Sequence, residues 1–199
     1  MAKRPEVVPN FIDGQWVHPR VDDVVDVFNP SLGEIIATAP LSTGADVDTA
    51  VQAAKRAFPA WRETPPVVRA RSMFKLKDAL ECHFEDLTRL VTTENGKTLD
   101  ESRGSVRRGI ECVEVACGAP SLMMGMALEN VAPGIDSCMV RQPIGVCAVI
   151  APFNFPLMVP LWFLPFAVVA GQHGGAQALR AGAALDAPRL RTCLLYTSD

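Results

Sequence analysis

The chain has 199 residues, 49% hydrophobic and 21% charged, a balance typical of a globular protein and not of a disordered chain. Its net charge of -3 comes from 19 basic and 22 acidic residues that are interspersed, which argues against a nucleic-acid partner because phosphate binding needs a concentrated basic surface. Six scattered cysteines without metal-ligand spacing, and no secretory signal, favour a reducing cytoplasm and no bound metal.

Two β hairpins are predicted at the start of the chain. The segment Phe11–Val17 reads as a short hairpin whose turn is Asp13-Gly14, a pair that tolerates positive φ. A second hairpin is predicted over residues 26–38, with its turn at residues 29–33. Both are expected to be surface elements that precede the first helix.

Helical spacing of apolar residues predicts three helices in the middle of the chain. The first begins at Ser42 or Thr43 as N-cap and ends before the Pro65-Pro66 pair. The second is expected to be one continuous helix that carries an apolar stripe over residues 70–91 and ends with Gly96 as a C-cap. The third runs from about Leu99 to Cys117.

The third helix is predicted to be amphipathic. One face is apolar, with Val106, Ile110, Val113 and Cys117, whereas the opposite face carries Arg103, Arg107, Glu111 and Glu114. The spacing of Arg107 and Glu111 allows an ion pair between them, so the charges are interpreted as a solvated face.

Two strands and a further helix follow. Strands are predicted at residues 137–141 and 144–150, and the continuous apolar run of the second suits a strand covered on both faces. The uncharged stretch 153–171 contains three prolines, which favours a buried helix after a turn over a membrane span. Helices on both sides of a buried sheet indicate an α/β fold, in one domain up to Gly171.

The turn after the second strand is the candidate functional site. In doubly wound sheets ligands bind at the carboxyl ends of the strands, where this turn places Asn154. The side-chain amide of Asn154 can donate a hydrogen bond to a developing oxyanion. Taken alone, the residue is more often structural, because asparagine is favoured in turns and at helix caps.

Longer phrases decide between these interpretations. Gln-Pro-Ile-Gly-Val (142–146) followed by Ala-Pro-Phe-Asn-Phe-Pro (151–156) resembles the aldehyde dehydrogenase superfamily, in which most members have tryptophan where this chain has Phe153. Together with Phe-Asn-Pro-Ser-Leu-Gly-Glu (28–34), Glu-Asn-Gly-Lys-Thr-Leu (94–99) and the segment 107–125, these phrases resemble the CoA-acylating methylmalonate-semialdehyde dehydrogenase branch. The resemblance covers roughly residues 8–171.

The resemblance implies a fold and a set of roles. Residues 1–171 would form a truncated Rossmann-type NAD-binding domain with N-terminal hairpins, and the strand near 137–141 would belong to the segment that joins subunits into a homo-oligomer. Asn154 would be the oxyanion donor, while Ala151 and Phe153 would line the NAD site or simply shape the turn. Arg108 would hold the carboxylate of the substrate, because a guanidinium matches a carboxylate bidentately; a surface ion pair is the competing interpretation.

The implied reaction uses NAD and coenzyme A. A cysteine thiolate attacks the aldehyde carbon of methylmalonate or malonate semialdehyde, Asn154 stabilises the oxyanion, and hydride passes to NAD. CoA then releases the thioester with loss of carbon dioxide, giving propionyl-CoA or acetyl-CoA. The alternatives are another semialdehyde dehydrogenase, such as a succinate-semialdehyde type, and a non-catalytic fragment that binds full-length subunits. Neither a membrane nor a nucleic acid is expected as a partner.

The resemblance stops after Gly171. Residues 172–182 are compatible with nucleotides that, read one base out of register, encode the family continuation Asn-Thr-Val-Val-Leu-Lys-Pro-Ser-Glu-Arg-Ala, so a frameshift is expected there. Residues 172–199 are therefore interpreted as an aberrant tail, and Cys193 as a poor nucleophile. We expect this chain to lack the catalytic cysteine and glutamate and to leave apolar surface of residues 155–170 uncovered.

Overall fold

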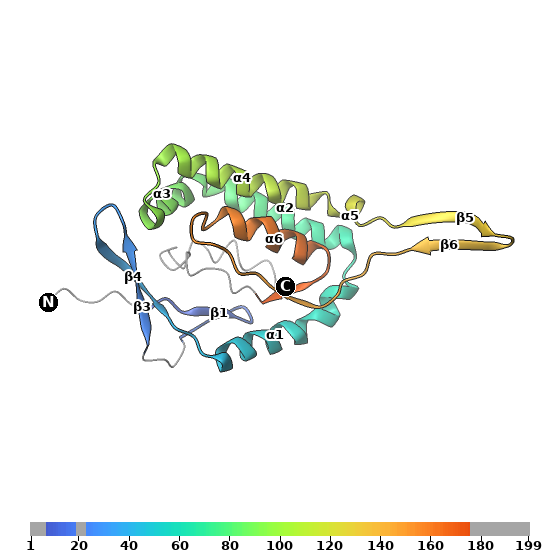
Figure 1. The fold of residues 1–199 in the computed structure, drawn as a ribbon, viewed down its shortest axis with the longest axis horizontal. Coiled ribbons are helices and arrows are strands. Elements are labelled where there is room, and N and C mark those ends of the chain that lie inside the picture. Colours follow the sequence, from blue (N-terminus) through green and yellow to red (C-terminus); the bar gives the residue numbers. More distant parts are fainter. Residues whose placement is uncertain (1–6, 19–22, 176–199) are drawn as a thin grey trace.

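The computed structural model describes residues 7–18 and 23–175, and it begins with two antiparallel hairpins (Figure 1). Strands β1 (Asn10–Ile12) and β2 (Gln15–Val17) form the first, and β3 (Val24–Asn29) and β4 (Glu34–Pro40) form the second. Asp13 and Gly14 have φ of 52° and 71°, the left-handed conformation that a tight hairpin turn requires. Both predicted hairpins are confirmed.

Helices occupy most of the next stretch. They are α1 (Gly44–Glu63), α2 (Pro66–Cys82), α3 (Phe84–Asn95), α4 (Leu99–Cys117) and the short α5 (Ala119–Leu122). Thr43 caps α1 in a capping box with Asp46, as its sequence position predicted. The bounds of α4 also agree with the prediction, and Gly96 is the left-handed C-cap of α3 with φ 74°.

The prediction of one continuous helix up to Gly96 is wrong, because the chain leaves helical geometry at His83. That residue has φ -104° and ψ 18° and separates α2 from α3. The turn allows Leu80 on α2 and Leu87 on α3 to enter the same core cluster. Phe74, expected in the apolar stripe, is instead 54% exposed.

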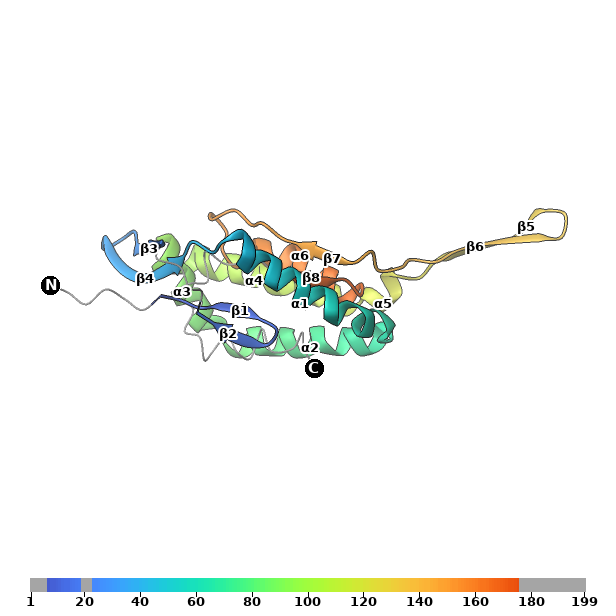
Figure 2. The ribbon, with the colours of Figure 1, turned by 90° about the horizontal axis from the view of Figure 1, so that it is seen from below.

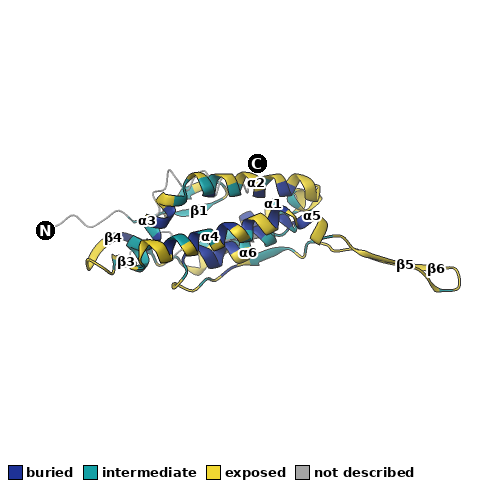
Figure 3. Cartoon of the chain, turned by 90° about the horizontal axis from the view of Figure 1, so that it is seen from above, coloured by how far each residue is buried: buried dark blue, intermediate teal, exposed yellow. Residues whose placement is uncertain are grey.

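Helix α4 is the centre of the core. Its residues Val106, Ile110 and Val113 are fully buried, and they pack with α2, α3 and α6 (Met158–Val169) (Figure 3). A Cβ atom on Gly109 would lie 2.9 Å from Leu161 Cδ1, so the glycine lets α4 and α6 approach closely. None of the helices in the described part is long and apolar enough to cross a membrane.

A parallel β-α-β unit ends the described part. Strand β7 (Val146–Ala148) leads through α6 to β8 (His173–Gly175), and the two strands pair in parallel. Strand β7 is shorter than predicted, and Ile144 and Ile150, which lie outside it, are 87% and 84% exposed instead of covered. Helix α6 (Met158–Val169) lies within the stretch 153–171 in which a helix after a turn was predicted. Residues 173–175, which belong to the predicted aberrant tail, pair with β7 as strand β8. The rest of that tail, with Cys193, lies outside the described residues.

A two-stranded ribbon projects away from the helices (Figures 1 and 2). It consists of β5 (Met126–Ala132) and β6 (Ile135–Met139), and nearly all of its residues are exposed. The strand predicted at 137–141 corresponds to β6 but begins and ends two residues earlier, and its partner β5 was not predicted. The ribbon has no buried face, so its sequence lacks the alternation that marks a half-buried strand.

Candidate active-site turn

The structure places three of the four predicted site residues in an exposed turn between β7 and α6. Asn154 is exposed, Phe153 is 62% exposed, and Ala151 is half-buried. The turn follows the carboxyl end of a parallel strand, the position at which α/β sheets bind ligands. The sequence therefore predicted where these three residues lie in the fold.

Two side chains from the loop between α3 and α4 bind the main chain of this turn. The amide Nδ2 of Asn95 donates to the Phe153 carbonyl at 3.0 Å, and Lys97 Nζ donates to the Asn154 carbonyl at 2.6 Å. The Lys97 ammonium also lies 3.7 Å from the centroid of the Phe155 ring. Sequence reasoning missed both contacts: the phrase 94–99 was noted only as part of the family resemblance.

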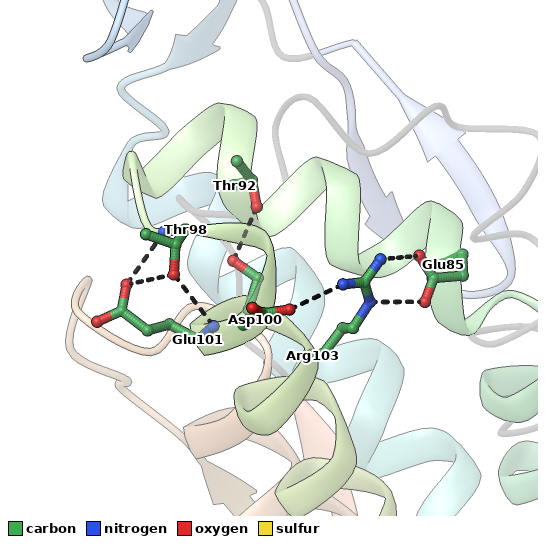
Figure 4. A network of polar contacts seen from close by, with 7 residues as sticks. Glu85, Thr92, Thr98, Asp100, Glu101 and Arg103 are labelled. Atoms are coloured by element: carbon green, nitrogen blue, oxygen red, sulfur yellow. Dashed lines mark hydrogen bonds and ion pairs between the residues drawn. The ribbon is translucent and has the colours of Figure 1, made fainter.

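The α3–α4 corner that carries Lys97 is itself held by polar contacts (Figure 4). Thr98 forms a capping box with Glu101, and Thr92 Oγ1 donates to Ser102 Oγ at 2.9 Å. The Thr98 backbone N–H, followed by its hydroxyl, holds the pKa of Glu101 below its usual value. Partial burial lowers the pKa of Lys97, and the Glu101 carboxylate opposes that shift.

Three arginines on α4 have different surroundings. Arg107 makes a bidentate pair with Glu81 on α2, with distances of 2.5 and 3.0 Å, so the predicted pair with Glu111 is replaced by a contact between helices. Arg103 bonds Glu85 and Asp100 (Figure 4). Arg108 is exposed, and no described residue forms an ion pair with it. No hydrogen bond or ion pair within the described ranges joins Arg108 to the turn.

The described cysteines all lie outside the Asn154 turn. Burial raises the pKa of Cys112 and of Cys117, with smaller contributions from neighbouring carboxylates, and this opposes the thiolate form that attacks carbonyls. Cys82 and Cys138 are exposed, and Cys147 is half-buried within β7.

The carboxyl end of α6 is fixed by a buried arginine. Arg69 on α2 is 2% exposed and donates from Nε to the Val169 carbonyl at 2.8 Å. Its Nη1 donates to carbonyls at the end of α1, including that of Thr64. Trp61 Nε1 adds a bond of 2.8 Å to the Val168 carbonyl. These contacts set the point from which β8 starts.

The whole arrangement matches proteins of known family. The model of the aldehyde dehydrogenase family matches residues 16–173. The chain belongs to the aldehyde dehydrogenase family. It is 52% identical over 170 residues to malonate-semialdehyde dehydrogenase 1 of Geobacillus kaustophilus, which covers 84% of this chain and 35% of that protein.

Solved structures of aldehyde dehydrogenases share the fold. Methylmalonate-semialdehyde dehydrogenase from Oceanimonas doudoroffii superposes with a TM-score of 0.86 at 42% identity, over 96% of this chain and 39% of that one. A putative methylmalonate-semialdehyde dehydrogenase from Sinorhizobium meliloti, complexed with NAD, gives 0.90 at 33% identity, over 98% and 40%. The chain thus spans 35% of the curated relative's length, and its mixed helix and strand structure is that of a partial aldehyde dehydrogenase.

Proposed function

We propose that the gene of this chain encodes an NAD-dependent, CoA-acylating dehydrogenase of methylmalonate or malonate semialdehyde, with propionyl-CoA or acetyl-CoA and carbon dioxide as products. The names of the relatives at 52% and 42% identity support this substrate class. The observation that carries the proposal is the exposed Asn154 turn at the carboxyl end of β7, within the family match. We further propose a cytoplasmic homo-oligomer, as the family resemblance implies.

The residues of the turn fit a dinucleotide. Phe153 offers an exposed aromatic face, and Ala151 presents main chain with only a methyl side chain, which permits close approach. When bound, NAD supplies the acceptor for the hydride of the aldehyde. Ala151 and Phe153 would hold it against the turn.

Asn154 would stabilise the oxyanion that forms when a thiolate attacks the aldehyde. Its side chain is exposed at the turn, and its main chain is held by Lys97. Removal of one such donor typically costs about 2.7–4 kcal/mol, or roughly 10²–10³ in kcat. Asn154→Ala in an active gene product should therefore lower kcat by roughly 10²–10³. A loss of less than about tenfold would refute the role.

Arg108 would bind the carboxylate of the semialdehyde. Its guanidinium is exposed and has no acidic partner among the described residues, in contrast to Arg103 and Arg107. A cation that is not neutralised by the protein remains available to an anionic ligand. The test is Arg108→Met, which should raise KM for the carboxylated semialdehyde far more than KM for a neutral aldehyde of equal length.

We propose that the 199-residue chain is itself inactive, because burial raises the pKa of Cys112 and of Cys117, and the other described cysteines lie on α2, β6 and β7, outside the Asn154 turn. Purified chain should give no NADH with malonate semialdehyde, NAD and CoA. CoA-dependent turnover would overturn this statement. Sequencing the gene beyond codon 171 tests the frameshift: displaced Lys-Pro-Ser-Glu codons and a downstream cysteine are expected, and a clean continuation of the present frame would refute it.

A second candidate function is association without catalysis, favoured by the exposed ribbon. Its apolar residues Met126, Leu128 and Ile135 are 68%, 64% and 55% exposed, and both outer edges of the two-stranded ribbon lack a third strand in the described part. Co-expression with a full-length relative distinguishes this candidate. A stable mixed complex is expected if it holds, and its absence would count against it.

A further inference from the structure

We infer that Lys97 and Asn95 are positioning residues that fix the orientation of Asn154. They bind the two carbonyl groups on either side of the Asn154 Cα atom, from a corner of the fold that lies 57 and 58 residues away in the sequence. We call these two hydrogen bonds the tether. The role of the tether in catalysis rests on the proposed function, whereas the two bonds themselves belong to the fold.

The geometry of the peptide bond explains why two contacts suffice. Each peptide unit is planar, so a residue has only two soft main-chain dihedrals, φ and ψ, which relate its two flanking planes. The Phe153 carbonyl belongs to the plane before the Asn154 Cα, and the Asn154 carbonyl belongs to the plane after it. Holding both carbonyls fixes φ and ψ of Asn154, and therefore the direction in which its side chain leaves the main chain.

Packing cannot supply this orientation. Asn154 and Pro152 are exposed, and Phe153 is 62% exposed, so the turn has little buried surface of its own. Exposed turns with few buried contacts open easily. The polar contacts from Asn95 and Lys97 are thus what restrains the turn within the described structure.

The anchor is rigid because Lys97 stands between two helix caps. Gly96 is the left-handed C-cap of α3, and Thr98 is the N-cap of α4 in a capping box with Glu101. A Cβ atom on Gly96 would lie 2.8 Å from Pro30 Cγ, so the corner also packs against the turn that joins β3 to β4. The main chain of Lys97 therefore has little freedom.

The side chain of Lys97 is restrained as well. Its ammonium lies 3.7 Å from the Phe155 ring centroid while it donates to the Asn154 carbonyl at 2.6 Å. The bond is charge-assisted, and such bonds are roughly twice as strong as neutral ones. The Lys97 ammonium thus contacts two consecutive residues, the carbonyl of Asn154 and the ring of Phe155.

Nuclear magnetic resonance of the isotope-labelled 199-residue chain tests the tether. The variants are Lys97→Met, which removes the donor, Lys97→Arg, which keeps a charged donor that can stack on Phe155, and Lys55→Met as a control at an exposed lysine of α1. The readouts are the Asn154 carbonyl ¹³C shift, the Phe155 amide ¹⁵N shift and the order parameter of the Asn154 backbone amide. Sedimented protein under magic-angle spinning gives the same readouts if the chain self-associates.

In Lys97→Met we expect both main-chain shifts to move and the order parameter of the Asn154 backbone amide to fall below about 0.6, the range of flexible backbone. Lys97→Arg should restore the main-chain shifts and the order parameter of Asn154 toward the wild-type values. Lys55→Met should leave these quantities unchanged, and the signals of the α4 core should stay constant in all three variants. The inference is overturned if Lys97→Met leaves the Asn154 order parameter unchanged. It is equally overturned if Met and Arg disrupt the turn alike, because a charged donor would then have no specific role.

Adding NAD to the wild-type chain separates this tether from the proposed function. Shifts at Ala151 and Phe153 are expected on binding. If NAD causes no shift while Lys97→Met still loosens Asn154, the proposed NAD site at Ala151 and Phe153 fails and the tether stands. If NAD binds and Lys97→Met leaves Asn154 rigid, only the tether fails.

Discussion

The replacement Arg69→Met tests how the end of the β-α-β unit is held. Arg69 is buried, yet its described partners are main-chain carbonyls and the sulfur of Met123, and none is an acid. Methionine keeps an unbranched apolar stem in the place of the arginine side chain and removes the guanidinium. The Val169 and Thr64 carbonyls then lose their charged donor.

The magnitude follows from these two principal contacts. Hydrogen bonds to charged groups contribute about 1.5–3 kcal/mol each, so two of them amount to about 3–6 kcal/mol. Part of this is offset, because a buried charge costs free energy to desolvate, and desolvation indeed lowers the pKa of Arg69. We therefore expect a net loss of about 2–4 kcal/mol in the free energy of unfolding, and Arg69→Lys should recover part of it.

Urea unfolding followed by far-ultraviolet circular dichroism measures this loss. The matched control is Arg71→Met, an exposed arginine on the same helix, which should stay within about 0.5 kcal/mol of the wild type. In thermal unfolding the Arg69 variant should melt roughly 4–16 °C lower. If the two variants unfold at the same urea concentration, the carbonyl cluster around Arg69 contributes nothing and the reasoning is refuted.

Acid should weaken the contact between α2 and α4. Hydrogen bonds from Arg107 hold the pKa of Glu81 below its unfolded value of about 4.3. The stabilisation is therefore complete above that value and is lost as pH falls through the lower pKa of the folded state. Arg107→Met should flatten the pH dependence of the unfolding free energy below about pH 4.5, and an unchanged slope would contradict this. Two helix-cap variants test whether the turn depends on the α3–α4 corner. Thr98→Ala and Thr43→Ala should each lower the free energy of unfolding in urea by about 1 kcal/mol. Only Thr98→Ala should also shift the Phe155 amide signal, because only Thr98 lies in that corner. Equal shifts in both variants would show that the turn does not depend on the α3–α4 corner.

Local signals predicted much of the fold. Residues that favour positive φ marked the hairpin turn at Gly14 and the helix end at Gly96, and Thr43 marked a helix start. The break at His83 carries no glycine or proline, so nothing in the sequence announced it. Its cause is tertiary, since α2 and α3 both turn their apolar residues toward α4.

The prediction of burial from hydrophobicity was wrong where apolar residues are exposed. Ile144 and Ile150 look like core residues in the sequence, but the three-residue strand β8 gives them no cover in the described part. The exposed ribbon strand β5 escaped prediction for a related reason, because it has no buried face. Apolar character alone does not reveal which partner is available.

The candidate site was only half visible in the sequence. Asn154 could be found because its turn follows a strand and carries a recognisable phrase. The bond from Lys97 to that turn joins residues 57 apart, and helical or strand periodicity does not report such a contact. Only the folded arrangement brings the α3–α4 corner to the β7–α6 turn.

The helix junctions of this molecule differ in how they respond to solution conditions. Arg69 bonds carbonyls, which do not titrate, and it is buried, so mobile ions screen it little. The pairs of Arg103 and Arg107 are partly exposed and use carboxylates, so both salt and acid weaken them. Rising salt or falling pH should therefore weaken the ion pairs that link α4 to α2 and α3, whereas the contacts of Arg69 with the ends of α1 and α6 should stay unchanged. Within the described residues, the ion-pair contacts of α4 with α2 and α3 therefore depend on salt and pH, whereas the contact of Arg69 with the end of α6 does not.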